Sequence, residues 1–179
     1  MTVTVEPREF KFVNFDAALI ERVARSMAEA IGIERPVRVE VDESTQLGRV
    51  EIDIADTVTL RIQSGALEDS RRPRHQSEGA TSATIGRALL RVRDRLEGGF
   101  GEAPDDDALS LRQAAAWDTY VAARLQRLGL PVNRQRYVYN FRNRHGFTDV
   151  ADGAFERIWQ TDGLTWGELE SISTTGAAS

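Results

Sequence analysis

Three short segments in the first third of the chain alternate apolar and polar residues, and this pattern limits the possible folds more than any other feature. The segments are Val37–Asp42, Val50–Ile54 and Val58–Gln63. Because successive side chains of a β-strand point to opposite faces, each segment places its aliphatic residues on one face and its polar residues on the other. The short gaps between the segments predict an antiparallel meander over residues 37–63 with one buried face.

The meander also predicts which side chains lie in the core. We expect the aliphatic residues of the three segments to be buried and the polar residues between them to be exposed. Two further strand-like segments, residues 3–5 and 10–13, are expected to extend the sheet. The expected buried residues are Val39, Val41, Ile52, Ile54, Leu60 and Ile62, and the expected exposed residues are Glu40, Asp53 and Arg61.

Helices are predicted on both sides of the meander and throughout the second half of the chain. Apolar residues at spacings of three and four indicate helices over about residues 15–32, 80–97, 108–128 and 133–144, with shorter ones after residue 149. The polar segment 64–78 is typical of a mobile loop. We therefore predict an α+β fold, with an α+β core over residues 1–100 and a helical C-terminal part over 101–179 that packs on the same core.

Composition excludes several classes of function. The 179 residues contain no cysteine, which excludes disulfides, thiolate zinc sites and thiol catalysis. The two histidines, His75 and His145, have no second ligand at metal-binding spacing, so we expect no metal and no other cofactor. The first residues lack a signal-peptide pattern and no apolar run reaches the ~20 residues of a membrane span. We therefore expect a cytoplasmic protein without membrane association.

Residues 133–145 form the most basic stretch, with four arginines, three aromatic residues and no acid. This mixture suits a phosphorylated ligand or unpaired bases, but an amphipathic helix that buries Tyr137 and Phe141 is the plainer interpretation. Because the formal net charge is -5 and nearly all basic residues are arginine, we expect no nucleic-acid binding at physiological salt. Nucleic-acid binding stays an alternative to a surface for a protein partner. The candidate surface is Arg134, Arg136, Tyr139, Arg142, Arg144 and His145.

A second basic cluster lies in the polar segment after the meander. A flexible arginine-rich loop can hold an anionic group by paired hydrogen bonds, and the plainer alternative is an ordinary solvated loop. The candidate anion-binding residues are Arg71, Arg72, Arg74 and His75. Carboxylates on the polar face of the meander could bind a cation or act as acid and base, but neighbouring arginines can neutralise them. These carboxylates are Glu40, Asp42, Glu51 and Asp53.

The order of elements over about residues 15–97, a helix, three strands and a helix, resembles the N-terminal half of the zincin-type metallopeptidases. In that family the helix after the last strand carries two metal-binding histidines, whereas residues 85–96 of this chain contain none. The resemblance therefore implies a metal-free relative without peptidase activity.

No group of residues matches a catalytic signature, and we assign no catalytic residue. We expect a non-catalytic interaction or ligand-binding protein, whose partner is another protein or a small anionic ligand. The alternative is an enzyme that acts on an anionic small molecule through carboxylates and arginines.

Overall fold

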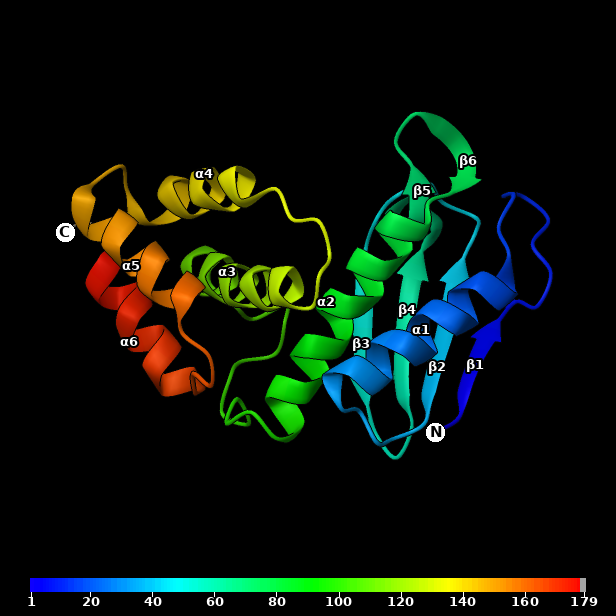
Figure 1. Ribbon diagram of the computed structural model, residues 1–179, viewed down its shortest axis with the longest axis horizontal. Coiled ribbons are helices and arrows are strands. Elements are labelled where there is room, and N and C mark those ends of the chain that lie inside the picture. The colour runs from blue at the N-terminus through cyan, green and yellow to red at the C-terminus, as the bar shows by residue number, and fades with distance from the viewer. Residues whose placement is uncertain (178–179) are drawn as a thin grey trace. The chain divides into compact units, whose positions relative to one another are not determined.

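The computed structural model describes residues 1–177 and divides into two compact units, Met1–Arg93 and Asp94–Ser179 (Figure 1). It contains helices and a small four-stranded sheet, so the predicted α+β class is confirmed. The strands of the first unit are β1 (Val3–Glu6), β2 (Val37–Asp42), β3 (Val50–Ile54), β4 (Val58–Gln63), β5 (Glu68–Asp69) and β6 (Arg72–Gln76). Its helical elements are α1 (Ala17–Ile31), the short turn η1 (Ser64–Leu67) and α2 (Glu78–Leu96), whose last residues belong to the second unit.

The main sheet of the first unit is mixed rather than wholly antiparallel. Its strand order is β1-β2-β4-β3, with β1, β2 and β4 parallel and β3 antiparallel to β4 at the edge. The predicted hairpin between β3 and β4 is present, but the predicted pairing of β2 with β3 is wrong, because β4 lies between them. Alternation along a strand tells which side chains share a face and carries no information on which strand lies next to it.

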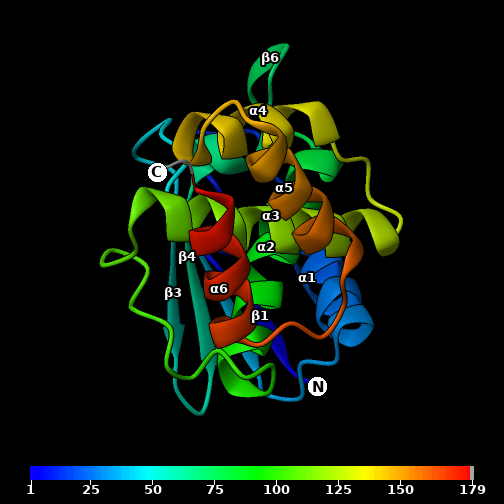
Figure 2. The same cartoon turned by 90° about the vertical axis from the view of Figure 1, so that its left-hand side faces the viewer.

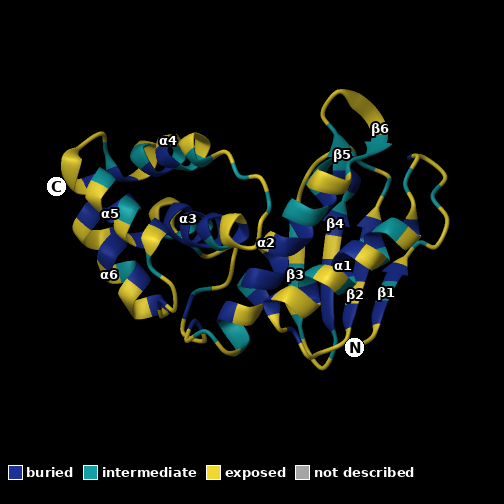
Figure 3. Ribbon diagram, viewed as in Figure 1, coloured by how far each residue is buried: buried dark blue, intermediate teal, exposed yellow. Residues whose placement is uncertain are grey.

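The burial of the sheet follows from this order. Helices α1 and α2 cover one face of the sheet (Figures 1 and 3), and there Val39, Leu60 and Ile62 are almost completely buried, as predicted. Ile52 and Ile54 are only half-buried, because they lie on the edge strand β3. On the other face, the polar residues Asp53 and Arg61 are exposed, and Glu40 is half-buried.

Two segments of the first unit differ from their predicted structures. The segment predicted as a mobile loop contains η1 and a two-stranded hairpin, β5–β6. The hairpin was not predicted because residues 72–76 show no alternation of apolar and polar residues. The segment 10–13, predicted as a strand, is an irregular loop, and the next residue, Asn14, forms a β-bridge to His75.

The second unit is built from α3 (Leu111–Arg127), α4 (Arg134–His145), α5 (Asp149–Gln160) and α6 (Trp166–Gly176). Helix α3 packs against each of the other three, and α5 lies beside α6 (Figure 2). Capping boxes open two of these helices, Ser110 with Gln113 at α3 and Thr165 with Glu168 at α6. Residues 178 and 179 of the predicted helical part lie outside the described residues, and its packing on the core of the first unit stays a prediction.

Among residues 1–177, no helix combines the length and the apolar character that crossing a bilayer requires.

Candidate functional site

A cavity of about 300 Å³ lies among the loops that follow the carboxyl ends of the parallel strands in the first unit. The loop after β1 contributes Phe12 and Val13, the loop after β2 contributes Glu43, Ser44 and Gln46, and hairpin β5–β6 contributes Arg74. Because the carboxyl ends of parallel strands meet at one edge of a sheet, ligands of open α/β sheets bind there. The cavity is therefore the first place to look for a ligand.

Hydrogen bonds join the loops around this cavity. The Oε2 atom of Glu43 accepts the backbone N–H groups of Lys11 at 2.8 Å and Phe12 at 2.7 Å, which ties the loop after β2 to the loop after β1. The N–H of Asn14 donates to the carbonyl oxygen of Arg74 at 2.8 Å. The walls of the cavity are thus held by the folded chain before any ligand arrives.

Hairpin β5–β6, with its turn, carries three arginines, of which Arg74 lines the cavity. The Oδ1 atom of Asp69 accepts the N–H of Arg71 at 2.9 Å and so closes the turn between the two strands. Arg74 has φ 64°, and among residues 1–177 it is the one residue other than glycine with a positive φ. A left-handed backbone costs an L-residue roughly 1–2 kcal/mol, so the hairpin holds Arg74 in a strained conformation.

The guanidinium groups of these arginines have no partner within the described chain. Arg71, Arg72 and Arg74 are exposed, and no side chain of residues 1–177 forms an ion pair or hydrogen bond with their guanidinium groups (Figure 3). Many other arginines of the unit do pair, for example Arg8 with Glu21 at 2.8 Å. The hairpin thus carries three guanidinium groups without a side-chain partner, and its own acids are Glu68 and Asp69 in β5.

The acidic groups near the cavity are engaged by the backbone. Glu43 accepts the two N–H groups described above. Asp42 accepts the hydroxyl and the N–H of Ser44, and these hydrogen bonds lower the pKa of the Asp42 carboxyl. The hydrogen bonds thus direct both carboxylates toward N–H and O–H donors of the chain.

The predicted anion-binding residues therefore share one hairpin, but they do not all reach the cavity. Arg74 lines the cavity, whereas Arg71 and Arg72 lie at the turn and the start of β6. The Nδ1 atom of His75 lies 3.4 Å from the side-chain nitrogen of Asn14, so this histidine helps to hold the neighbouring loop. Sequence reasoning missed Phe12 and Glu43, and nothing in their local sequence marks them.

The six residues of the predicted partner surface lie on helix α4 in different environments: some form ion pairs, some are exposed and one is buried. Arg142 forms two hydrogen bonds with Asp152, at 2.7 and 2.8 Å, and this contact lowers the pKa of the Asp152 carboxyl. Arg134 pairs with Glu156 on α5. Arg136, Tyr139 and Arg144 are exposed, and they are the members of the predicted surface that are accessible without breaking an ion pair. Figure 2 shows α4 and α5 close together.

His145, the sixth residue, is not at the surface. Its ring is 1% exposed, with Nδ1 3.1 Å from the carbonyl oxygen of Phe141 and Nε2 2.7 Å from Oγ of Ser173. Burial lowers the pKa of His145, and the charge of Arg112 acts in the same direction. The basic neighbours in the sequence suggested a charged surface histidine, but the spacing Phe141–His145 places both rings on the buried face of α4.

The carboxylates of the sheet do not form a cluster. Arg61 lies between Glu40, at 3.1 Å, and Asp53, at 3.8 Å, and Arg49 pairs with Glu51 at 3.2 Å. Because β4 separates β2 from β3, the two pairs of acids are not neighbours. Within residues 1–177, no group of His, Asp or Glu side chains is arranged to hold a metal ion.

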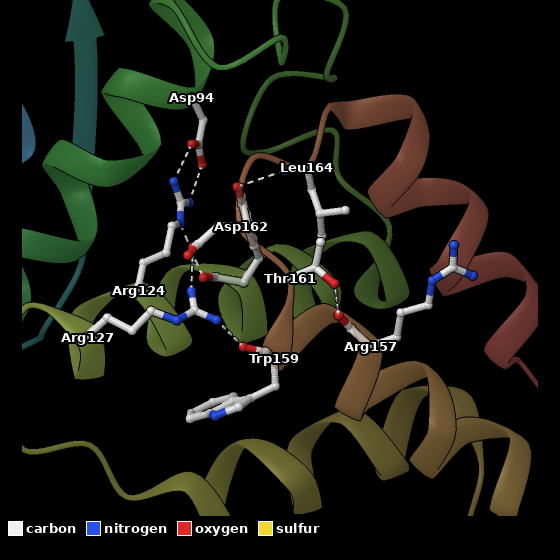
Figure 4. Close-up of polar contacts among 9 residues, drawn as sticks. Asp94, Arg124, Arg127, Arg157, Trp159, Thr161, Asp162 and Leu164 are labelled. Carbon is white, nitrogen blue, oxygen red and sulfur yellow. Dashed lines mark hydrogen bonds and ion pairs between the residues drawn. The ribbon is translucent and has the colours of Figure 1, made fainter.

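The second unit contains a buried charged pair that no local sequence pattern indicates. Arg124 binds Asp94 through two hydrogen bonds of 2.6 Å (Figure 4). The indole N–H of Trp117 donates to the same carboxylate at 2.8 Å. The guanidinium also lies 3.8 Å from the ring centroid of Tyr120, whose oxygen accepts the N–H of Leu164 at 3.1 Å. Burial raises the pKa of Tyr120.

This cluster has the properties of a structural element rather than of a reactive site. Both oxygens of Asp94 and both terminal nitrogens of Arg124 are occupied by each other. Two neighbouring hydrogen bonds join α3 to the end of α5 and the segment after it. Arg127 donates to Asp162 at 2.6 Å and to the carbonyl oxygen of Trp159 (Figure 4). The cluster therefore fixes α3 to the end of α2 and to the segment before α6.

The candidate site thus consists of the cavity and the arginine hairpin of the first unit. Comparison of the chain with protein-family models, with curated proteins and with solved structures finds no match. The function must therefore be argued from the geometry of the site.

Proposed function

We propose that the first unit binds a small anionic ligand, without catalysis, in the cavity at the carboxyl ends of its parallel strands. The observation that supports this proposal is the cluster of three unpaired arginines, Arg71, Arg72 and Arg74, on the hairpin that borders the cavity. Guanidinium groups are weakly hydrated and form paired hydrogen bonds with carboxylates and phosphates. An anion would therefore give these guanidinium groups the partners that they lack within the described chain.

The strained conformation of Arg74 agrees with a binding role. A strained non-glycine residue persists when the surrounding contacts enforce it, and such residues cluster at ligand-binding sites. Here the carbonyl oxygen of Arg74 is fixed by Asn14 while its side chain borders the cavity. Phe12, which is 66% exposed and also borders the cavity, offers an apolar surface beside the charge.

Isothermal titration calorimetry tests the proposal with three probes, inorganic phosphate, citrate and adenosine monophosphate. We expect saturable binding of at least one probe by the full chain. The dissociation constant should rise at least tenfold in the double variant Arg72→Gln/Arg74→Gln, because the anion loses its guanidinium donors. The affinity should also fall as sodium chloride is added.

The matched control replaces an exposed arginine of α1, Arg22→Gln, and should bind like the parent protein. Two outcomes contradict the proposal. One is the absence of saturable binding for all three probes, and the other is binding that the double variant retains at full strength.

A further inference from the structure

A second exposed feature lies on the helical unit, where Tyr139, Phe147 and Val150 form what we call the aromatic corner. Their exposed fractions are 60%, 65% and 60%. The ring centroids of Tyr139 and Phe147 are 6.2 Å apart in an edge-to-face arrangement. Tyr139 lies on α4, Phe147 in the turn before α5, and Val150 in the first turn of α5. The corner thus combines one outer helix face with the adjoining turn.

Most other aromatic side chains of the unit are buried, although the aliphatic residues Leu111 and Leu128 are also exposed. Phe100, Trp117 and Phe141 are completely buried. A single exposed apolar residue is ordinary, but adjacent large ones mark a surface that binds another molecule. Tyrosine, arginine and phenylalanine are also enriched at protein interfaces.

The charge around the corner is positive, although the whole chain carries a formal net charge of -5. Arg136 and Arg144 are exposed, and no side chain within residues 1–177 pairs with their guanidinium groups. Arg112 adds a third cation, since its Nε donates to the carbonyl oxygen of Arg144 at 3.0 Å. The adjoining acids are Asp149, in the first turn of α5, and Asp152, which Arg142 neutralises.

We propose that the aromatic corner binds an acidic protein segment that also carries apolar side chains. The apolar residues of the segment would cover Tyr139 and Phe147, and its carboxylates would pair with Arg136 and Arg144. This charge complementarity selects an acidic partner. Three side chains form a small contact, so the complex is of the weak, transient kind.

Single-stranded nucleic acid is the less suitable occupant of the same surface. Asp152 and Glu156 already neutralise Arg142 and Arg134, two of the four arginines of α4. Val150 and Phe147 add apolar area, which an acidic peptide covers with its own apolar side chains and a phosphate backbone does not.

Selection from a phage-displayed library of random twelve-residue peptides, with the full-length protein as target, tests this proposal. We expect the enriched peptides to contain both acidic residues and Leu, Phe or Trp. Measured by fluorescence anisotropy, their dissociation constants should rise at least tenfold in Phe147→Ser and in Arg136→Glu/Arg144→Glu. Exchanging the acidic residues of the peptide for lysine should restore binding to the charge-reversed variant and abolish binding to the parent.

Two control variants separate the corner from the general surface. Leu128→Ser removes an exposed apolar residue at the end of α3, and Arg22→Glu reverses a charge in the first unit, and both should bind like the parent. Thermal unfolding of every variant establishes that it is folded, and the exposure of the replaced side chains leads us to expect melting temperatures close to that of the parent.

Three outcomes would overturn the proposal. The first is a selection that yields no peptide sensitive to Phe147→Ser. The second is binding of a twelve-residue oligothymidine that depends on Arg136 and Arg144, which would assign the surface to nucleic acid. The third is a dimer in analytical ultracentrifugation that Phe147→Ser dissociates, which would make a second copy of the chain the occupant.

Discussion

Arg74 combines an unfavourable backbone conformation with a place at the cavity. Glycine adopts φ 64° without steric cost but is more flexible in the unfolded chain. We therefore expect Arg74→Gly to leave the free energy of unfolding unchanged or to raise it by up to about 1 kcal/mol, while it weakens anion binding. Arg72→Gly, at a β6 residue that pairs with Asp69 and has no positive φ, should instead lower it by about 0.5–1 kcal/mol. Equal losses in urea unfolding would contradict this account of strain.

The pair Asp94–Arg124 is the clearest residue-scale contribution to stability. Their side chains are 3% and 14% exposed, so Arg124→Met would leave a buried carboxylate without its partner. We expect the free energy of unfolding to fall by about 3–5 kcal/mol. Urea unfolding monitored by tryptophan fluorescence measures this loss. Arg127→Met, which removes the more exposed pair with Asp162, should cost about 1 kcal/mol or less. Similar losses in the two variants would show that burial is not the cause.

His145 gives the stability a dependence on pH. Because burial lowers its pKa in the folded state, protons bind more readily to the unfolded chain. Its contribution to stability is therefore complete above the unfolded pKa of about 6.5 and is lost as the pH falls toward the folded pKa. We expect the free energy of unfolding to fall between pH 7.5 and 5.5, and this slope to be smaller in His145→Gln. His75→Gln controls for the loss of a histidine, and an unchanged slope in His145→Gln would refute the prediction.

At the scale of elements, the spacing of apolar residues and the capping residues were sufficient to predict the helices. The buried face of α1 and the capping box Thr165–Glu168 both follow from local sequence, because each depends on residues within one or two turns. Hairpin β5–β6 could not be found in this way. Its strands are short and polar. The bridge from His75 to Asn14 supports it, and the hydrogen bond from the N–H of Ser77 to Leu67 closes its base.

The turn η1 shows how tightly the elements of the first unit approach. A Cβ atom at Gly65 would lie 1.9 Å from the carbonyl oxygen of Gln46 and 2.5 Å from that of Leu47. Gly65→Ala should therefore cost about 1–3 kcal/mol of stability and displace the loop that lines the cavity. Gly153→Ala on α5, where a Cβ meets no atom within 4 Å, should raise stability by about 0.5–1 kcal/mol. Urea unfolding distinguishes them, and equal shifts would contradict the close approach.

At the scale of the whole molecule, the class of fold could be predicted from the sequence, but the order and direction of its strands could not. Alternation predicts which side chains of β2 and β4 are buried. The parallel pairing of the two strands depends on the path of the chain between them. Asp94 and Arg124 are likewise brought together by the packing of helices, not by a local pattern. The candidate anion-binding residues were identifiable because they are neighbours in the sequence. Glu43 lies near Arg74 only in the folded structure, where both line the cavity.

The contact between Glu43 and the backbone of Lys11 also has a practical consequence for chemistry on this protein. Lys11 is the single lysine of the chain, its side chain is exposed, and its backbone is fixed beside Phe12 at the cavity rim. Amine-reactive dyes can therefore attach at Lys11 and at the N-terminal amine alone. A single labelling reaction would place a fluorophore next to the cavity, without any engineered cysteine.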